Sequence, residues 1–386
     1  MDVETFINDV KAADWYDDQL VHWEKISGRD SIVGELNCLL SDETMEALGD
    51  IGVHSFFYHQ AEAINAIQDG HNVIVSTSTS SGKSLCYNVP IVEDLCSDKS
   101  KKALYLFPTK ALSQDQSRGL DRITTLHNNL RHDIFDGDTP ATDRTEIRKR
   151  ARIVITNPDM LHLGILPNHR SWHTFFKGLK YVVVDEAHIY RGVFGSNFSN
   201  LMKRLRRICA SLGSVPQFIF CSATISNPRE HAKNLTGLEF ELIEVDGSPS
   251  SGKDFIFWNP STIDSAIGSR RSTNWESAKL TTQLLRKQIR SMTFVRGRRQ
   301  AEVVHLYVRD NLSRIDPSKV EKLAPYKGSY LPEDRRLIEK ALFDGSLLGL
   351  ITTNAMEVGV DVGELDATVL TGFPGSIVST WQQSGR

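Results

Sequence analysis

Two short segments of this chain carry residue types that bind and split a phosphate chain. In TSTSSGKS, residues 77–84, backbone N–H groups can wrap around phosphates while Lys83 meets the β/γ charge and the Ser84 hydroxyl meets Mg²⁺. In DEAH, residues 185–188, Asp185 can hold the same Mg²⁺ and Glu186 can activate an attacking water. The two segments together predict a site that binds and hydrolyses a nucleoside triphosphate.

The first segment departs from the GxxxxGK[ST] pattern because Thr77 replaces the first glycine. Gly82 keeps the position where backbone approaches phosphate most closely, so we expect the loop to work. Alone, it could be a Ser/Thr-rich turn, and Asp185 with Glu186 could be an ordinary acidic pair. Their joint occurrence favours a nucleotide site, with phosphate-binding candidates Thr77, Ser78, Thr79, Ser80, Ser81, Gly82, Lys83 and Ser84.

Apolar runs must place these segments. NVIVS (72–76) predicts a strand feeding the first loop, and YVVVD (181–185) predicts a buried strand that ends on the carboxylate. Between residues 51 and 246, apolar runs alternate with helical stretches, which indicates a doubly wound parallel sheet. The predicted strands are 72–76, 103–107, 131–135, 152–156, 181–185, 217–221 and 241–245.

A polar stretch at 246–253 (DGSPSSGK) predicts a linker and hinge, after which the alternation resumes in a second α/β domain. We expect helices at 274–290, 298–310 and 332–344, and strands at 291–295, 348–352 and 367–371. The expected division is a lead-in over 1–50, a first domain over 51–246 and a second over 247–386.

Composition excludes several classes of protein. The chain has 386 residues, of which 40% are hydrophobic and 24% charged, with a formal net charge of −3, so no basic excess announces a nucleic-acid binder. Its five cysteines are scattered without CxxC spacing, which predicts reduced thiols, an intracellular setting and no zinc site. No apolar run approaches about 20 residues, so we expect a soluble protein without membrane contact. KRLRR (203–207) is either a nuclear address or, as we favour, a basic helix face.

The order of the motifs is more specific than any one of them. TSTSSGKS is followed by PTKAL (108–112), TNPDML (156–161), DEAH and SAT (222–224). In this order the chain resembles a superfamily-2 DExH-box helicase over nearly all of residues 51–386. The resemblance implies an α/β fold of two RecA-like domains, each a mostly parallel sheet with helices on both faces, as in P-loop NTPases. It also implies ATP as the nucleotide and places His188 with the catalytic residues.

Further segments resemble the motifs of that superfamily. FFYHQ (56–60) is similar to the element that recognises adenine, with Gln60 on the base and Phe57 stacking. SAT offers Ser222 and Thr224 to couple hydrolysis to movement. TFVRGRRQAE (293–302), TNAMEVGVD (353–361) and QQSGR (382–386) resemble motifs IV, V and VI. The resemblance implies nucleotide contacts by Gly359 and Asp361, and an arginine-finger role for Arg386.

Several longer segments around these motifs resemble the Hrq-type RecQ-like DNA helicases of fungi and their bacterial DEAH relatives. The segments concerned are SSGKSLCYNVP, DEAHIYRGVFGS, SVPQFIFCSATISNP, FWNPS and YLPEDRR. This implies an ATP-dependent DNA helicase with 3′-to-5′ movement on single-stranded or partly duplex DNA, a role in genome maintenance or repair, and a nuclear location in a eukaryote. The sequence stops within motif VI, so we expect a fragment that hydrolyses slowly and unwinds poorly.

Nucleic acid in such proteins is held mostly by its backbone, which side-chain hydroxyls, amides and cations can bind without reading sequence. Asn157 could equally open a helix, and Arg298 could lie on a solvated face. Two other functions stay open: RNA unwinding, and an ATP-binding scaffold with little unwinding activity. The candidate nucleic-acid contacts are Thr109, Lys110, Thr156, Asn157, Arg191, Arg296, Arg298 and Thr352.

Overall fold

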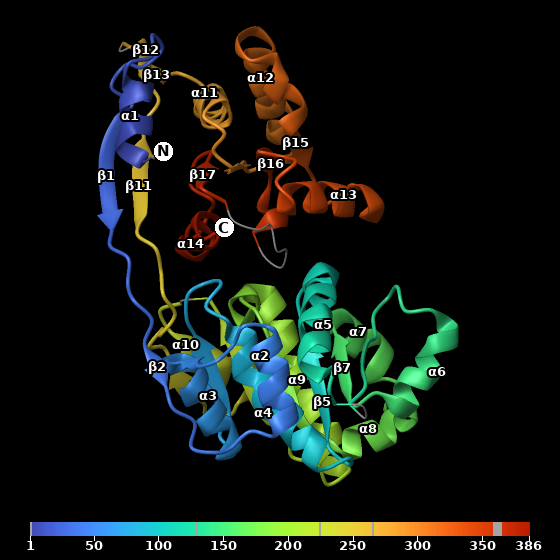
Figure 1. Cartoon of the computed structure of the whole chain (residues 1–386). Coiled ribbons are helices and arrows are strands. Elements are labelled where there is room, and N and C mark those ends of the chain that lie inside the picture. The colour runs from blue at the N-terminus through green and yellow to red at the C-terminus, as the bar shows by residue number, and fades with distance from the viewer. Residues whose placement is uncertain (1, 128–129, 224, 265, 358–364) are drawn as a thin grey trace. The chain divides into compact units, whose positions relative to one another are not determined.

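The computed structural model describes the chain except residues 1, 128–129, 224, 265 and 358–364. The chain divides into two compact units (Figure 1). One unit is continuous and spans residues 30–249. The other unit combines residues 1–29 with residues 250–386. The chain therefore passes from one unit to the other twice, at residues 29–30 and at residues 249–250.

The continuous unit contains a seven-stranded sheet in which every neighbouring pair is parallel, as the sequence predicts. Each strand overlaps a predicted one, and the order across the sheet is β10-β4-β9-β8-β5-β7-β6. The strands are β4 (Val73–Ser76), β5 (Lys102–Leu106), β6 (His132–Ile134), β7 (Ile153–Thr156), β8 (Leu179–Val184), β9 (Gln217–Ser222) and β10 (Glu241–Ile243). Because β9 lies between β4 and β8, the strand ends that carry TSTSSGKS, SAT and DEAH follow one another along one edge.

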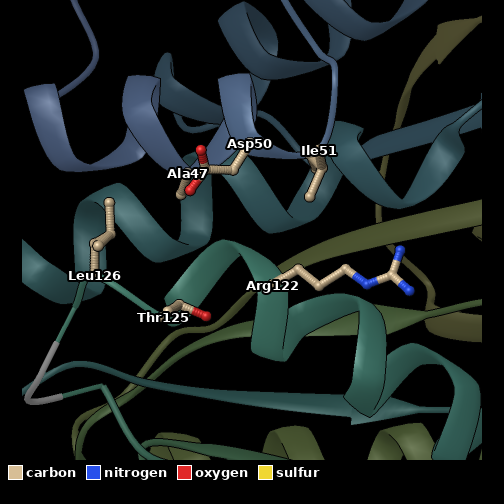
Figure 2. Close-up of a pocket in the computed structure, with 6 residues that line it drawn as sticks. All are labelled: Ala47, Asp50, Ile51, Arg122, Thr125 and Leu126. Atoms are coloured by element: carbon tan, nitrogen blue, oxygen red, sulfur yellow. The ribbon is translucent and has the colours of Figure 1, made fainter.

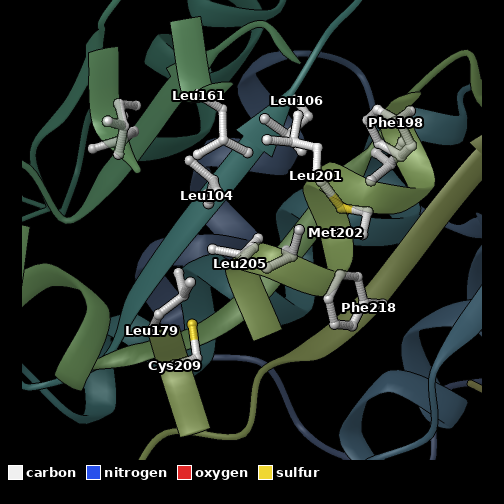
Figure 3. Packing of buried hydrophobic residues seen from close by; sticks show 14 of the residues in the cluster. Leu104, Leu106, Leu161, Leu179, Phe198, Leu201, Met202, Leu205, Cys209 and Phe218 are labelled. Carbon is white, nitrogen blue, oxygen red and sulfur yellow. The ribbon is translucent and has the colours of Figure 1, made fainter. Parts of the chain in front are cut away.

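Helices cover both faces of this sheet. On one face, α9 (Gly192–Ser211) packs Leu201, Met202 and Leu205 against Leu104 and Leu106 of β5 (Figure 3). Leu205 lies four residues after Leu201 and three after Met202, which is the spacing of one helical face. On the other face, α4 (Lys83–Ser97) brings the ring of Tyr87 edge-on to Tyr105 of β5, with centroids 5.4 Å apart. Successive β5 residues point to opposite faces, so a sheet buried on both sides explains a strand without polar alternation.

The remaining helices of this unit lie between and around these strands. Their bounds are α2 (Asp42–Asp50), α3 (Tyr58–Gln68), α5 (Lys110–Thr124), α6 (Ala141–Arg150), α7 (Pro158–Met160), α8 (His173–Lys177) and α10 (Pro228–Thr236), with the short pair β2 (Val33–Gly34) and β3 (Phe56–Phe57). Helix α2 packs on α5 and leaves a shallow hollow of about 350 Å³ (Figure 2). No residue of the phosphate-binding or DEAH segments lines this hollow.

The second unit has a four-stranded parallel sheet in the order β15-β16-β14-β17. The sequence predicts three of these strands and misses β15 (Leu323–Tyr326), a short edge strand that contains Pro325. Proline lacks the N–H that a ladder needs, so it is tolerated at an edge but weakens the sequence signal. The other elements are α11 (Thr273–Arg286), β14 (Ser291–Phe294), α12 (Arg298–Ile315), α13 (Pro332–Phe343), β16 (Gly349–Thr352), β17 (Ala367–Leu370) and α14 (Ile377–Ser384).

The first residues of the chain belong to this second unit. After α1 (Val3–Lys11), strand β1 (Leu20–Ile26) pairs antiparallel with β11 (Lys253–Trp258), which follows the predicted linker. Trp15 packs on Trp258 with ring centroids 5.9 Å apart, and its carbonyl accepts a hydrogen bond from Arg271. The segment expected to be a lead-in thus supplies a strand to the C-terminal half of the protein. The short strands β12 (Thr262–Asp264) and β13 (Ser269–Arg270) complete this unit.

Both passages between the units are hydrogen-bonded to each other. Arg29 and Ser250 exchange backbone hydrogen bonds of 2.9 and 3.0 Å, and the Ile32 N–H donates to the Gly247 carbonyl at 2.9 Å. A Cβ at Gly247 would lie 2.6 Å from the Ile32 oxygen and 2.6 Å from the Tyr58 nitrogen, so only glycine fits there. The stretch 246–250, called the connector below, is therefore a packed segment.

Candidate nucleotide site

The phosphate-binding loop lies between β4 and α4. Gly82 has φ +74 at the start of α4, and a Cβ there would approach the Gln60 amide nitrogen to 2.5 Å, so this position requires glycine. Thr77, which replaces the first glycine of the pattern, is buried, and its hydroxyl lies 2.8 Å from the Ser81 hydroxyl. Thr77 is not among the described residues with positive φ, so its backbone has no need of glycine.

Lys83 rests on its own loop in this structure. Its Nζ donates to the Ser78 carbonyl at 2.5 Å and to the Thr77 carbonyl at 3.3 Å. Both acceptors are neutral carbonyl oxygens, so a phosphate can displace them by offering a full negative charge to the ammonium group. The geometry fits a lysine that is available to an incoming phosphate chain.

Asp185 is buried at the end of β8, and two groups hold its carboxylate. The Glu186 N–H donates to Oδ1 at 2.7 Å, and the Tyr87 hydroxyl donates to Oδ2 at 3.2 Å. Burial, with the nearby Glu186 charge, raises the pKa of Asp185 to about 7, although Lys83 acts in the opposite direction. A bound cation would stabilise the charged form of this buried carboxylate, because it replaces the hydration that the carboxylate has lost.

The donor set at this place suits Mg²⁺, which prefers hard oxygen ligands and keeps several waters. Asp185 supplies a buried carboxylate, and Ser84 begins the same helix that carries Tyr87. Within the described residues, no group of three or more His, Cys, Asp or Glu side chains forms a metal cluster.

Glu186 has a backbone that few residues adopt. Its φ of 51° and ψ of 44° lie in the left-handed region, which is strained for a residue with a side chain. Such strain costs roughly 1–3 kcal/mol and is tolerated when the surroundings hold the residue in place. Asp185 supplies part of that support by accepting the Glu186 N–H. The turn separates the roles of the two neighbouring carboxylates.

His188 connects DEAH with SAT. The Ala223 N–H donates to His188 Nδ1 at 3.3 Å, while Glu186 Oε2 lies 3.4 Å from the same nitrogen. The ring of His188 therefore lies within reach of both the SAT backbone and the Glu186 carboxylate. Of the two coupling candidates in SAT, the Ser222 hydroxyl donates to the Ala223 carbonyl at 2.8 Å, and Thr224 lies outside the described residues.

The predicted adenine-binding residues brace the loop from α3. The amide of Gln60 donates to the Gly82 carbonyl at 3.1 Å and accepts the Phe57 N–H at 3.0 Å. Phe57 is half-buried, and its ring stacks near His59 with centroids 6.2 Å apart. Adenine recognition by Gln60 and Phe57 stays a prediction, because both polar ends of the Gln60 amide have partners within the chain.

The candidate nucleic-acid contacts of the continuous unit fall into two groups. Thr109 and Asn157 cap helices, since their side-chain oxygens accept the N–H groups of Leu112 and Met160. The buried Thr156 hydroxyl donates to the Phe135 carbonyl at 2.6 Å. Lys110 and Arg191 are exposed instead, and Lys110 donates to Asp138 at 2.6 Å.

The candidates of the second unit also differ in exposure. Arg296 is exposed and donates to the Phe373 carbonyl at 3.0 and 2.6 Å, and exposed Arg298 opens α12. Thr352 is buried, and its hydroxyl donates to the Thr353 carbonyl. Arg386 donates from Nε and Nη2 to the Glu357 carbonyl at 3.1 and 2.5 Å, within its own unit. Gly359 and Asp361 lie outside the described residues.

Four residues at this site are not predicted from the sequence. Tyr87 holds Asp185, His231 donates from Nε2 to the Ala187 carbonyl at 2.8 Å, and His59 and Asp246 hold the phosphate-binding loop. For Tyr87 a signal existed, because a residue four positions after the P-loop lysine lies one turn further along the helix that the loop begins. The other three contacts depend on tertiary packing alone.

Comparisons with known proteins identify the family of this chain. The family model described as DEAD/DEAH box helicase matches residues 57–231, and the model described as helicase conserved C-terminal domain matches residues 276–386. The chain carries the two domains of a superfamily-2 helicase. Its fold of parallel-sheet units is the RecA-like architecture of that superfamily.

Among its relatives, this chain is 41% identical to the ATP-dependent helicase HRQ1 of Saccharomyces cerevisiae, over all of this chain and 36% of the relative. It is 40% identical to the uncharacterized ATP-dependent helicase YprA of Bacillus subtilis, over 98% of this chain and 50% of the relative. It also resembles the crystal structure of the DUF1998 helicase MrfA bound to DNA and AMPPNP. There the TM-score is 0.92 at 40% identity, over all of this chain and 53% of that one. The chain thus spans about half or less of the length of these relatives.

Proposed function

We propose that this chain is the motor region of an ATP-dependent DNA helicase or translocase. The single observation that carries the proposal is the alignment of three strand ends along one sheet edge. β4 leads to the loop before Lys83, Asp185 directly follows β8, and β9, which ends at Ser222 of SAT, lies between these two strands. Ligands of open α/β sheets bind at the carboxyl ends of their strands, where these groups lie.

In the proposed chemistry, Lys83 leaves its loop carbonyls to neutralise phosphate charge, and Glu186 orients the attacking water. Ser84 and Asp185 would hold Mg²⁺, which supplies charge neutralisation between the phosphates. His188 would transmit a movement of the DEAH segment to SAT, because its ring accepts the Ala223 N–H. These steps need only oxygen ligands, one lysine and one carboxylate, all present at one edge of the sheet.

DNA as the polymer is supported by the relatives. A MrfA structure 40% identical to this chain is described as bound to DNA, and the fungal relatives are named ATP-dependent helicases. We further propose 3′-to-5′ movement, a role in genome maintenance and, in a eukaryote, a nuclear location.

Among the described residues, none of the helices has the length and apolar content needed to cross a bilayer.

For the nucleic-acid surface of each unit we favour its exposed cations, which are Lys110 and Arg191 in the continuous unit and Arg296 and Arg298 in the second, because they can reach solvent without breaking a buried contact. Thr109, Thr156, Asn157 and Thr352 are proposed to shape the backbone near that surface, since their side chains already have partners in the chain. Such contacts hold phosphate and leave sequence unread.

The decisive experiment measures ATP hydrolysis without nucleic acid, with single-stranded DNA and with single-stranded RNA. We expect DNA to stimulate hydrolysis more than RNA. Lys83→Ala should abolish hydrolysis while leaving the fold intact, because it removes a charge from a surface loop. Stimulation by RNA alone would indicate an RNA helicase, and binding of ATP without stimulation would indicate a scaffold. Duplexes with a single 3′ or 5′ tail then test the direction of movement.

A further inference from the structure

The connector is bonded directly to the phosphate-binding loop. One oxygen of Asp246, Oδ2, accepts the Ser78 N–H at 3.1 Å and the Ser78 hydroxyl at 2.5 Å. The other oxygen, Oδ1, accepts the Ser248 N–H at 3.0 Å and its hydroxyl at 2.6 Å. The Asp246 side chain is only 8% exposed. The two hydrogen bonds from Ser78 join one end of the loop to the segment that leads to the other unit, and the two from Ser248 fix the carboxylate within that segment.

His59 makes a second link between the same two segments. Its ring is fully buried, Nδ1 accepts the Gly247 N–H at 3.2 Å, and Nε2 lies 2.9 Å from the Ser81 carbonyl. Because Nδ1 accepts, the proton sits on Nε2 and is donated to Ser81. Nδ1 also lies 3.8 Å from Asp246 Oδ1. One imidazole thus connects the connector backbone to the loop just before Gly82.

The resting position of Lys83 depends on the residue that Asp246 holds. Lys83 Nζ donates to the Ser78 carbonyl, while the N–H and hydroxyl of Ser78 donate to Asp246. The connector has little freedom to move away, because Gly247 is pressed between Ile32 and Tyr58. The chain of bonds therefore runs from the catalytic lysine through Ser78 to a clamped part of the connector.

We propose that Asp246 and His59 are positioning residues that tether the phosphate-binding loop to the connector, so that nucleotide occupancy is felt in residues 246–250. The tether holds the loop in a conformation ready for phosphate, which lowers the ordering cost of binding. It acts on affinity, since it touches neither Glu186 nor Asp185. This inference rests on the proposed nucleotide site.

The first test is a set of variants of the full chain, read out as affinity for a fluorescent ADP analogue with Mg²⁺ and as KM and kcat for ATP. We expect Asp246→Ala to raise Kd and KM about tenfold, with kcat within about twofold. Glu244→Gln is the matched control, because Glu244 is an exposed carboxylate two residues before Asp246. Thermal unfolding of each nucleotide-free variant shows whether the fold survives.

A double-mutant cycle separates the tether from a direct phosphate contact by Ser78. Ser78→Ala should weaken binding in the wild-type chain and have no further effect in an Asp246→Asn background. Additive effects would overturn the tether, because the hydroxyl would then act independently of the carboxylate. Tighter binding in Asp246→Asn would also overturn it, since repulsion of phosphate by the carboxylate would outweigh positioning. If the Asp246 variants unfold, hydrogen exchange in the wild-type chain with and without nucleotide still decides.

Hydrogen exchange tests communication with the connector directly. Adding ADP and Mg²⁺ should slow exchange in peptides covering the loop and in peptides covering Gly247 and Ser248. In Asp246→Asn, protection should remain in the loop and disappear from the connector. Loop protection with an unchanged connector in the wild-type chain would refute the tether. No protection anywhere would instead refute the proposed nucleotide site, so the two failures are distinguishable.

Discussion

Replacing Tyr87 with phenylalanine removes a single oxygen that links the P-loop helix to the DEAH carboxylate. The Tyr87 hydroxyl has one hydrogen and two acceptors, Asp185 Oδ2 at 3.2 Å and Gln116 Oε1 at 3.1 Å. A hydrogen bond to a charged group contributes about 1.5–3 kcal/mol, and a shared hydrogen places this one at the lower end. About 1.4 kcal/mol corresponds to a tenfold change in an equilibrium constant.

We therefore expect Tyr87→Phe to raise the Mg²⁺ concentration for half-maximal ATP hydrolysis about tenfold, because Asp185 loses a group that orients it. Activity should recover at high Mg²⁺, since Lys83 and Glu186 remain. The assay is steady-state ATP hydrolysis titrated with Mg²⁺ at saturating ATP and fixed pH.

The same strand and helix offer a matched control. Tyr105 is equally buried, contacts the ring of Tyr87, and donates its hydroxyl to Asn88 at 3.0 Å. Tyr105→Phe makes the same chemical change without touching Asp185. Equal shifts of the Mg²⁺ dependence in both variants would indicate a general effect on the core, and no shift in either would show that Tyr87 does not act on Asp185. Each of these results refutes the assignment of Tyr87 to Asp185.

Three further outcomes follow from the same geometry. Glu186→Gln should keep Mg·ATP binding and lower kcat roughly a hundredfold or more, as loss of a general base does; loss of nucleotide binding would assign Glu186 a structural role. Arg298→Ala should weaken single-stranded DNA binding and reduce the slope of log K against log salt by about 0.7; an unchanged slope would remove Arg298 from the DNA surface. Leu205→Ala in α9 should lower the free energy of unfolding by about 2–5 kcal/mol in urea denaturation; a loss below about 1 kcal/mol would contradict the packing in Figure 3.

Elements with strong local signals could be predicted from the sequence. Apolar runs such as YVVVD determine a buried strand whatever surrounds them, and the glycine at position 82 is required by its own backbone. The edge strand β15 was missed because Pro325 weakens the pattern and only the neighbouring β16 stabilises it. The pairing of β1 with β11 was missed because it joins distant parts of the chain, and no local pattern specifies a partner.

The candidate site divides in the same way. Lys83, Asp185 and Glu186 could be predicted because each belongs to a short motif whose residue types and spacing are those that phosphate binding and hydrolysis require. The supporting partners Tyr87, His59 and Asp246 were not predicted, since each acts through a hydrogen bond that exists only after folding. The connector shows the limit most plainly. A Gly/Ser/Pro-rich stretch is typical of a loose linker, yet Gly247 is there because it packs too tightly for a side chain.

The pairing of β1 with β11 has a consequence for the order of folding. Trp23 and Asp254, joined by a hydrogen bond of 2.6 Å, are 231 residues apart in the chain. During synthesis, the continuous unit of residues 30–249 emerges whole and can fold before β11 exists. Strand β1, with Val21 exposed even in the finished protein, must wait unpaired until that later segment arrives. This waiting strand is the place where we expect a slow phase in refolding and a hazard of aggregation.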